Sequence, residues 1–280
     1  MEKIRRRVDR TQKREGFVMG PVDIGLIQLL SAYIFVVVLM LILRIRRIPR
    51  EKEVLVASIR MTFQLVMAGF VLSYILDHPS PLYTILAVLV MEIFAIYNVY
   101  KRARLSLPAR VKKRLELFIA ISVSTGTLLS LVYFLYVVVR ISPWFDPRYV
   151  IPLAGMIIGN SMTGVSLGVK TLSESITIQK DIVEAALMLG ARPKDAVRMF
   201  SDRAFDSAIL PTLNSMIGMG IVFLPGMMTG QILSGASPIT AIKYQIAIML
   251  GILGGVTISV SVFLYLGYKA FFNRENQLIV

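Results

Sequence analysis

Long apolar segments separated by polar loops constrain the fold of this chain more than any other feature. A helix needs roughly 20 apolar residues to cross about 30 Å of hydrocarbon, and several segments reach that length. Apolar residues make up 56% of the 280 positions, and the charged residues, at 17%, lie mostly between the segments. A backbone that crosses lipid must satisfy its own hydrogen bonds, so we expect an all-α, polytopic membrane protein.

The hydropathy pattern predicts about seven transmembrane helices. Their approximate bounds are 24–43, 54–76, 82–100, 117–139, 150–169, 209–233 and 242–268. The sixth span contains Pro211 and Pro225, and both are expected to break the helix because proline has no backbone N–H. Trp144, in the short connection after the fourth span, is typical of an aromatic anchor at the membrane surface.

Loop charge predicts the orientation of these helices. The loops after the first, third and fifth spans are rich in Lys and Arg, whereas those after the second and sixth spans contain neither. Because basic loops stay in the cytoplasm, the N-terminus is expected outside and the C-terminus in the cytoplasm. The long polar loop, about 170–203, then lies inside the cell, and the protein is expected to be a multi-pass protein of the cell (inner) membrane.

The first 18 residues do not fit this orientation. Residues 1–18 are polar and basic, lack the apolar core of a signal peptide, and are expected to be disordered or to form a short surface helix. Such a basic stretch favours the cytoplasm. Two explanations stay open: the native start is Met19, or the N-terminus is cytoplasmic and the first span does not cross fully. Residues 19–280 form the expected transmembrane domain.

The charge balance and two absent residue patterns narrow the function. Lys and Arg number 31 against 17 Asp and Glu. In a soluble chain this excess would suggest nucleic acid, but here it lies in loops that anionic lipid attracts, so membrane lipid is the expected partner and nucleic acid is not. The absence of cysteine excludes disulfides and thiolate metal sites. The sequence contains no phosphate-binding Gly-rich loop and only one His, and we expect no catalytic residue.

The polar loop 170–203 contains a short helix signal at residues 184–190, EAALMLG. Ile182, Ala186 and Leu189 share one apolar stripe at helical spacing, and the alanines permit close approach of a partner. Gly190 is predicted to end this helix in a left-handed conformation, and Pro193 to begin the next element. These features favour a helix on which another protein docks.

The spacing Glu-Ala-Ala, three residues, Gly resembles the cytoplasmic loop by which ABC-transporter permeases dock onto their ATPase subunit. With segments 60–65, 151–162, 224–233 and Tyr244-Gln245, it makes residues 19–280 similar to the iron-export ABC transporter permeases of the FetB type (UPF0014). The resemblance implies a homodimeric permease paired with a separate cytoplasmic ABC ATPase subunit. That subunit would hydrolyse ATP, so no cofactor is expected on this chain. The implied ATPase-docking residues are Glu184, Ala185, Ala186 and Gly190.

Polar groups inside the spans are candidates for a translocation path, because they are costly in lipid and usually face a bundle interior or water. Arg60 and Gln64 lie one turn apart in the second span, and Glu92 lies near the centre of the third. Arg60 could form a structural ion pair with Glu92 or extend to the membrane surface. A buried Glu92 carboxylate without an adequate partner could instead exchange protons or bind a hard cation.

Further path candidates lie in the fifth and sixth spans. Asn160 and Asn214 supply amide groups, and Met227 and Met228 supply thioethers beside the expected break. Helix–helix hydrogen bonding and apolar packing explain these residues at least as well as a path does, and the sequence specifies no metal ligands.

Four glycines in the fifth span recur at helical spacing. They form two Gly-x-x-x-Gly pairs, 155/159 and 164/168. Such pairs predict close helix approach and, by extension, a dimer seam.

The leading hypothesis is therefore the permease subunit of an ABC transporter that exports iron or another metal ion. Two alternatives stay open. One is a proton-coupled secondary metal carrier that uses Glu92 and needs no ATPase. The other is a non-transporting membrane scaffold that recruits a cytoplasmic partner through the 184–190 helix. Ion movement in sealed vesicles, with and without an ATPase, separates the three.

Overall fold

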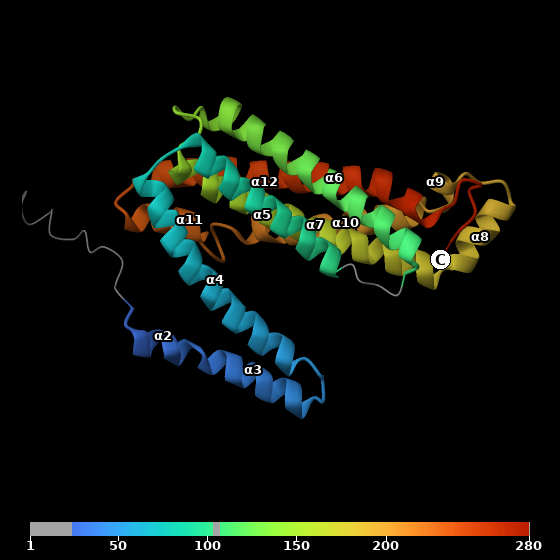
Figure 1. Cartoon of the computed structure of the whole chain (residues 1–280), viewed down its shortest axis with the longest axis horizontal. Helices are drawn as coiled ribbons and strands as arrows, with labels where there is room; N and C mark the ends of the chain where they lie inside the picture. Colours follow the sequence, from blue (N-terminus) through green and yellow to red (C-terminus); the bar gives the residue numbers. More distant parts are fainter. Residues whose placement is uncertain (1–23, 103–106, 280) are drawn as a thin grey trace, which may run out of the picture. The chain divides into compact units, whose positions relative to one another are not determined.

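A computed structural model of the chain describes residues 24–102 and 107–279 and is almost entirely helical (Figure 1). The basic segment 1–18 and Met19 lie outside the described residues. The helices are α2 (Leu26–Ala32), α3 (Ile34–Ile45), α4 (Glu51–Asp77), α5 (Pro81–Arg102), α6 (Ala109–Tyr133), α7 (Pro147–Ile178), α8 (Lys180–Met188), α9 (Pro193–Ala196), α10 (Arg198–Gly218), α11 (Gly226–Leu233) and α12 (Pro238–Gly267). A π-helical turn, η1 (Phe134–Val139), continues α6, and a 3-10 turn, η2 (Tyr268–Phe271), continues α12.

Among residues 24–102 and 107–279, six helical segments are long and apolar enough to cross a membrane. They are Leu26–Ile45, Glu51–Asp77, Pro81–Arg102, Ala109–Val139, Pro147–Ile178 and Pro238–Phe271. These segments correspond to the predicted spans one to five and seven, and the all-α polytopic class is confirmed. The total of seven spans and the orientation stay predictions.

The predicted sixth span, 209–233, is not a single helix. α10 continues through Pro211, so the break expected there is wrong, and α10 ends at Gly218. Beyond it Gly220 has a φ of +83°, a conformation that glycine adopts without steric cost, and Pro225 has no N–H to continue a helix. The break predicted at Pro225 is confirmed, because α11 begins only after it.

The chain forms two compact units. The first comprises α2, α3, α4, α11 and the first residues of α12, and the second comprises α5 to α10 with the rest of α12 and η2. In the first unit α3 and α4 form a hairpin (Figure 1), and the hydroxyls of Tyr33 and Thr62 hydrogen-bond to each other within it. In the second unit α7 is the central helix, packed against α5, α6 and α10.

Small residues let α7 lie close to its neighbours in the second unit. A Cβ atom on Gly164 would lie 2.8 Å from Val256 Cγ1 on α12 and 3.3 Å from the Ala208 carbonyl oxygen on α10. Gly168 also faces α10, so the close approach predicted for this pair is confirmed. The pair is buried inside the unit and is not available as a dimer seam. By contrast, a Cβ atom on Gly159 would meet no atom of another described element within 4 Å.

α6 and α12 interlock through small residues. Gly126 and Ser130 lie one turn apart on α6, as Gly255 and Ser259 do on α12. A Cβ atom on Gly126 would collide with Ser259 Oγ, and one on Gly255 would lie 3.4 Å from Ser130 Oγ. Each glycine therefore makes room for the serine of the other helix, as in small-x-x-x-small helix pairs of membrane proteins.

We expect Gly126→Ala to destabilise the protein by roughly 1–3 kcal/mol, the range for an overpacked core. The new methyl group would also lie 2.5 Å from the backbone nitrogen of Ser259, which no side-chain rotation relieves. Thermal unfolding in detergent measures the effect. Gly159→Ala is the matched control and should leave the unfolding midpoint nearly unchanged. Equal midpoints for both variants would contradict the close contact of α6 and α12.

Candidate functional sites

The predicted docking helix is α8, which follows α7 after a bend at Gln179. The 32 residues of α7 extend about 48 Å at 1.5 Å per residue, more than the roughly 30 Å of a bilayer's hydrocarbon core. α7 is therefore long enough to cross that layer and still project beyond it toward α8. Val183 anchors α8, since its side chain is fully buried. Figure 1 shows α8 and α9 together at one end of the helices of the second unit.

Gly190 ends α8 as the sequence predicts. Its φ is +88°, and its N–H donates to the Leu187 carbonyl oxygen at 2.9 Å. The N–H of Ala191 donates to the Ala186 carbonyl oxygen at 3.0 Å. These two bonds form a Schellman motif, which satisfies carbonyls at the end of the helix. α9 then begins at Pro193, so the predicted start of a new element there is also confirmed.

Large apolar side chains at the end of α8 are uncovered. Met188 and Leu189 are 86% and 89% exposed, and Ile182 is 53% exposed. Of the predicted docking residues, Ala186 is half-buried and the exposed ones are Glu184, Ala185 and Gly190. Contiguous exposed apolar surface usually marks a site of interaction, so this arrangement suits the docking of another protein. The docking role itself stays a prediction.

Charged residues lie close to this apolar surface. A groove of about 470 Å³ is bounded by α9, α10 and α12, and α9 packs against α8. The charged side chains that line the groove are Lys194, Asp195, Arg198 and Asp202. Cations and carboxylates alternate there, which would fix the register of a bound partner more than its affinity.

Glu92 is half-buried on α5 and contacts a hydroxyl of α6. Thr127 Oγ1 lies 3.1 Å from Glu92 Oε1 and 3.0 Å from Oε2, and it also lies 2.8 Å from the Val123 carbonyl oxygen. A hydroxyl has one proton and donates to one of these acceptors at a time. The Glu92 carboxylate therefore keeps free acceptor capacity for a proton or a cation.

Carboxylates do not gather around Glu92. In residues 24–102 and 107–279, no three His, Cys, Asp or Glu side chains form a group that could hold a metal ion. Arg60 and Gln64 are exposed on α4, in the other unit. The pairing of Arg60 with Glu92 and a place for Gln64 in the path stay predictions.

The remaining path candidates lie on three helices. Asn160 Nδ2 donates to the Met156 carbonyl oxygen at 2.8 Å, so this amide bonds within α7 rather than to a neighbouring helix. Asn214 is exposed on α10. On α11, Met227 is half-buried and Met228 is buried. A role for any of them in transport stays a prediction.

Sequence reasoning missed two polar contacts. Thr127 is one, and buried Gln245 on α12 is the other, because its Nε2 donates to Met219 Sδ at 3.7 Å beside the end of α10. A polar side chain within an apolar span is the signal that could have found both. Their partners depend on which helix faces come together, which spacing along one helix does not reveal.

Comparison with known proteins finds relatives that match most of the chain. The family model described as "Uncharacterised protein family (UPF0014)" matches residues 26–272. The UPF0014 membrane protein STAR2 of Oryza sativa subsp. japonica is 39% identical over 233 residues, which cover 83% of this chain and 79% of the relative. No solved structure matches the chain.

Two further relatives match over a similar length. The probable iron export permease protein FetB of Escherichia coli is 35% identical over 249 residues, which cover 89% of this chain and 93% of the relative. Protein ALUMINUM SENSITIVE 3 of Arabidopsis thaliana is 35% identical over 254 residues, which cover 91% of this chain and 90% of the relative.

Proposed function

The chain belongs to the UPF0014 family of membrane proteins, and from this premise we propose that it is the permease subunit of an ABC transporter in the cell (inner) membrane. A separate cytoplasmic ATPase subunit supplies the energy by docking on α8. The observation that carries the proposal is the exposed apolar end of α8, with Leu189 89% exposed, and α8 follows a helix that is longer than the hydrocarbon layer is thick. Similarity to a relative named as a probable iron export permease supports export of iron or another metal ion.

In this proposal ATP binding closes a pair of ATPase subunits and moves α8. α7 leads directly into α8 and packs against α5 and α6, so the movement reaches the contact between Glu92 and Thr127. The cargo cation would be met there by one carboxylate and a hydroxyl. A site of few ligands suits transport, because an ion must leave as readily as it enters.

Two copies of the chain would form the complete permease. Gly159 supports this arrangement, because it leaves an open place on α7 where another helix could approach closely. The other glycine pair of α7, Gly164 and Gly168, already packs against helices of the same chain.

The test is ATP-dependent movement of Fe(II) into sealed inverted vesicles that contain this chain and the ATPase. We expect uptake that needs ATP and persists when the proton gradient is dissipated. Uptake without the ATPase that stops with the proton gradient would favour the secondary carrier. Pairing and ATP turnover without iron movement would retain the ABC permease and discard iron. Pairing without movement of any tested ion and without ATP turnover would favour the scaffold.

A further inference from the structure

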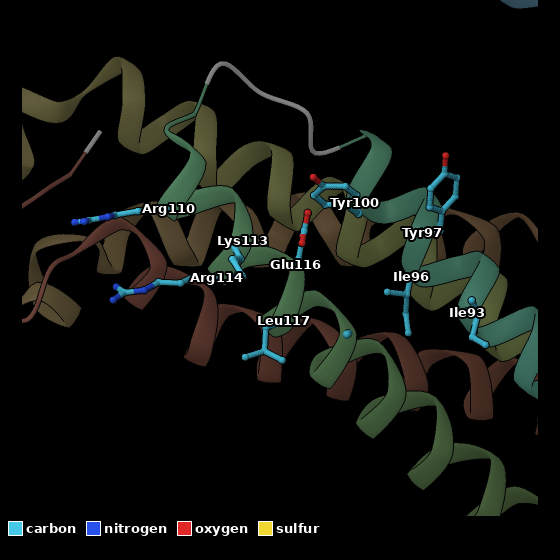
Figure 2. A pocket seen from close by; sticks show the side chains of 10 residues that line it. Ile93, Ile96, Tyr97, Tyr100, Arg110, Lys113, Arg114, Glu116 and Leu117 are labelled. Carbon is cyan, nitrogen blue, oxygen red and sulfur yellow. The ribbon is translucent and has the colours of Figure 1, made fainter.

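A groove of about 1040 Å³ lies between the end of α5 and the beginning of α6. Its lining is apolar at one end, where Ile93 and Ile96 lie, and Leu117 lies between them and the arginines of α6 (Figure 2). Figure 2 shows Arg110 and Arg114 on α6 at the opposite end from Ile93 and Ile96. The groove therefore runs from an apolar end to a cationic end, and Glu92 does not line it.

The charged groups of the groove are mostly cations, and two of these cations form no polar contact within the described residues. Arg110 and Lys113 are exposed, and within the described part of the chain neither forms a hydrogen bond or an ion pair. Arg114 is held in place, since its Nη1 donates to the Phe272 carbonyl oxygen at 2.9 Å. Glu116, which is half-buried, is the carboxylate among the lining residues. Three cations thus face one acid.

Two tyrosines, Tyr97 and Tyr100, also line the groove. On α5 they follow Ile93 and Ile96 toward the end of the helix, at the depth where tyrosine is enriched in membrane proteins. The groove therefore changes from apolar to aromatic to cationic. A phospholipid changes in the same order, from acyl chain to interface to headgroup.

We propose that this groove binds one anionic phospholipid from the leaflet on the basic side of the protein, which loop charge predicts to be cytoplasmic. The headgroup phosphate lies between Arg110 and Lys113, and an acyl chain lies along Ile96 and Leu117. Basic pockets between transmembrane helices recognise anionic headgroups in this way, because a cation near the apolar layer is poorly screened.

Lipid fits the groove better than a soluble ligand does. A free phosphate would occupy the cationic end and leave the apolar end uncovered. A docking protein would have to reach Ile93, which lies nine residues, or roughly 14 Å, below the end of α5 at Arg102. The predicted span 82–100 places that depth inside the apolar layer, where an acyl chain is already present.

The test is lipid retention by the full chain in nanodiscs of phosphatidylcholine mixed with phosphatidylglycerol, read by native mass spectrometry. We expect wild type to retain phosphatidylglycerol in preference to phosphatidylcholine. Arg110→Gln combined with Lys113→Gln should weaken that retention roughly thirtyfold, the loss expected when two cations near the surface are removed. Both side chains are exposed, so the protein should fold normally.

Arg50→Gln combined with Lys52→Gln is the matched control, because it removes the same charge at exposed positions outside the groove. It should retain phosphatidylglycerol as wild type does. Equal loss in both pairs, or equal retention of phosphatidylcholine by wild type, would overturn the proposal. Glycerol phosphate, a headgroup without acyl chains, should not displace the lipid. Displacement at concentrations similar to those of the lipid would assign a soluble-anion site and also overturn it.

Discussion

Replacing Gly190 with proline is expected to abolish ATP-driven transport while the protein still inserts in the membrane. Gly190 has a φ of +88°, whereas proline is held near −65° and lacks the N–H that Gly190 donates to Leu187. The Schellman motif would be lost, and Leu189 would leave the exposed face of α8. The measurement is ATPase activity of the copurified complex, which should fall to that of the ATPase alone.

Two further variants separate the shape of α8 from its surface. Gly190→Asn should keep most of the activity, because Asn tolerates the left-handed conformation better than other residues with a side chain. Glu184→Lys leaves the helix end intact but reverses a charge on the exposed face, and it should also abolish coupled activity. Normal coupled activity in both Gly190→Pro and Glu184→Lys would contradict a docking role for α8.

Glu92→Gln is expected to reduce ATP-dependent metal uptake by roughly ten- to a hundredfold, while the ATPase subunit still copurifies. Gln has nearly the same shape and can still accept a hydrogen bond from Thr127, so the packing of α5 against α6 should survive. The variant lacks the negative charge that would bind the cation. Hydrogen bonds to charged groups contribute about 1.5–3 kcal/mol, which corresponds to the expected loss of uptake. The measurement is uptake of Fe(II) into inverted vesicles.

Removal of a hydroxyl controls for general damage to the helices. Thr127→Val should lower uptake less than Glu92→Gln does, because the carboxylate remains. Thr163→Val removes a hydroxyl that donates to the Gly159 carbonyl oxygen, at 3.1 Å within α7, and should leave uptake unchanged. Full uptake in Glu92→Gln would exclude this carboxylate from the path.

The membrane helices could be predicted because each one satisfies its own backbone, so local hydropathy is enough to find it. The ends of these helices could not be predicted in this way. The apolar segment ends at the first charged residue, whereas the helix can continue beyond it. The fifth span was expected to end at 169, yet α7 continues to Ile178. In the added turns Lys170 and Glu174 face each other one turn apart, 4.0 Å between charged atoms, an arrangement that suits a helix in water.

In the candidate sites too, features that depend on neighbouring residues could be predicted, and features that depend on packing between helices could not. The left-handed Gly190 and the start at Pro193 were predictable, because a helix cap depends on a few neighbouring residues. The contact of Glu92 with Thr127 was not, since it joins positions 35 residues apart through the packing of two helices. The two glycine pairs of α7 also looked alike in the sequence. Only the packing shows that Gly164 meets two helices while Gly159 meets none.

The length of α7 has a mechanical consequence. A helix of 32 residues is about 48 Å long, so if it tilts as one body by about 5° about one end, its other end moves by about 4 Å. Because α8 follows α7 directly, a small displacement of α8 would move the end of α7 and tilt the whole helix. The helices packed along α7 would be displaced too, and more so the farther their contact lies from the fixed end of α7. A small rotation of α8 would thus change the opening of the proposed translocation path between the membrane helices.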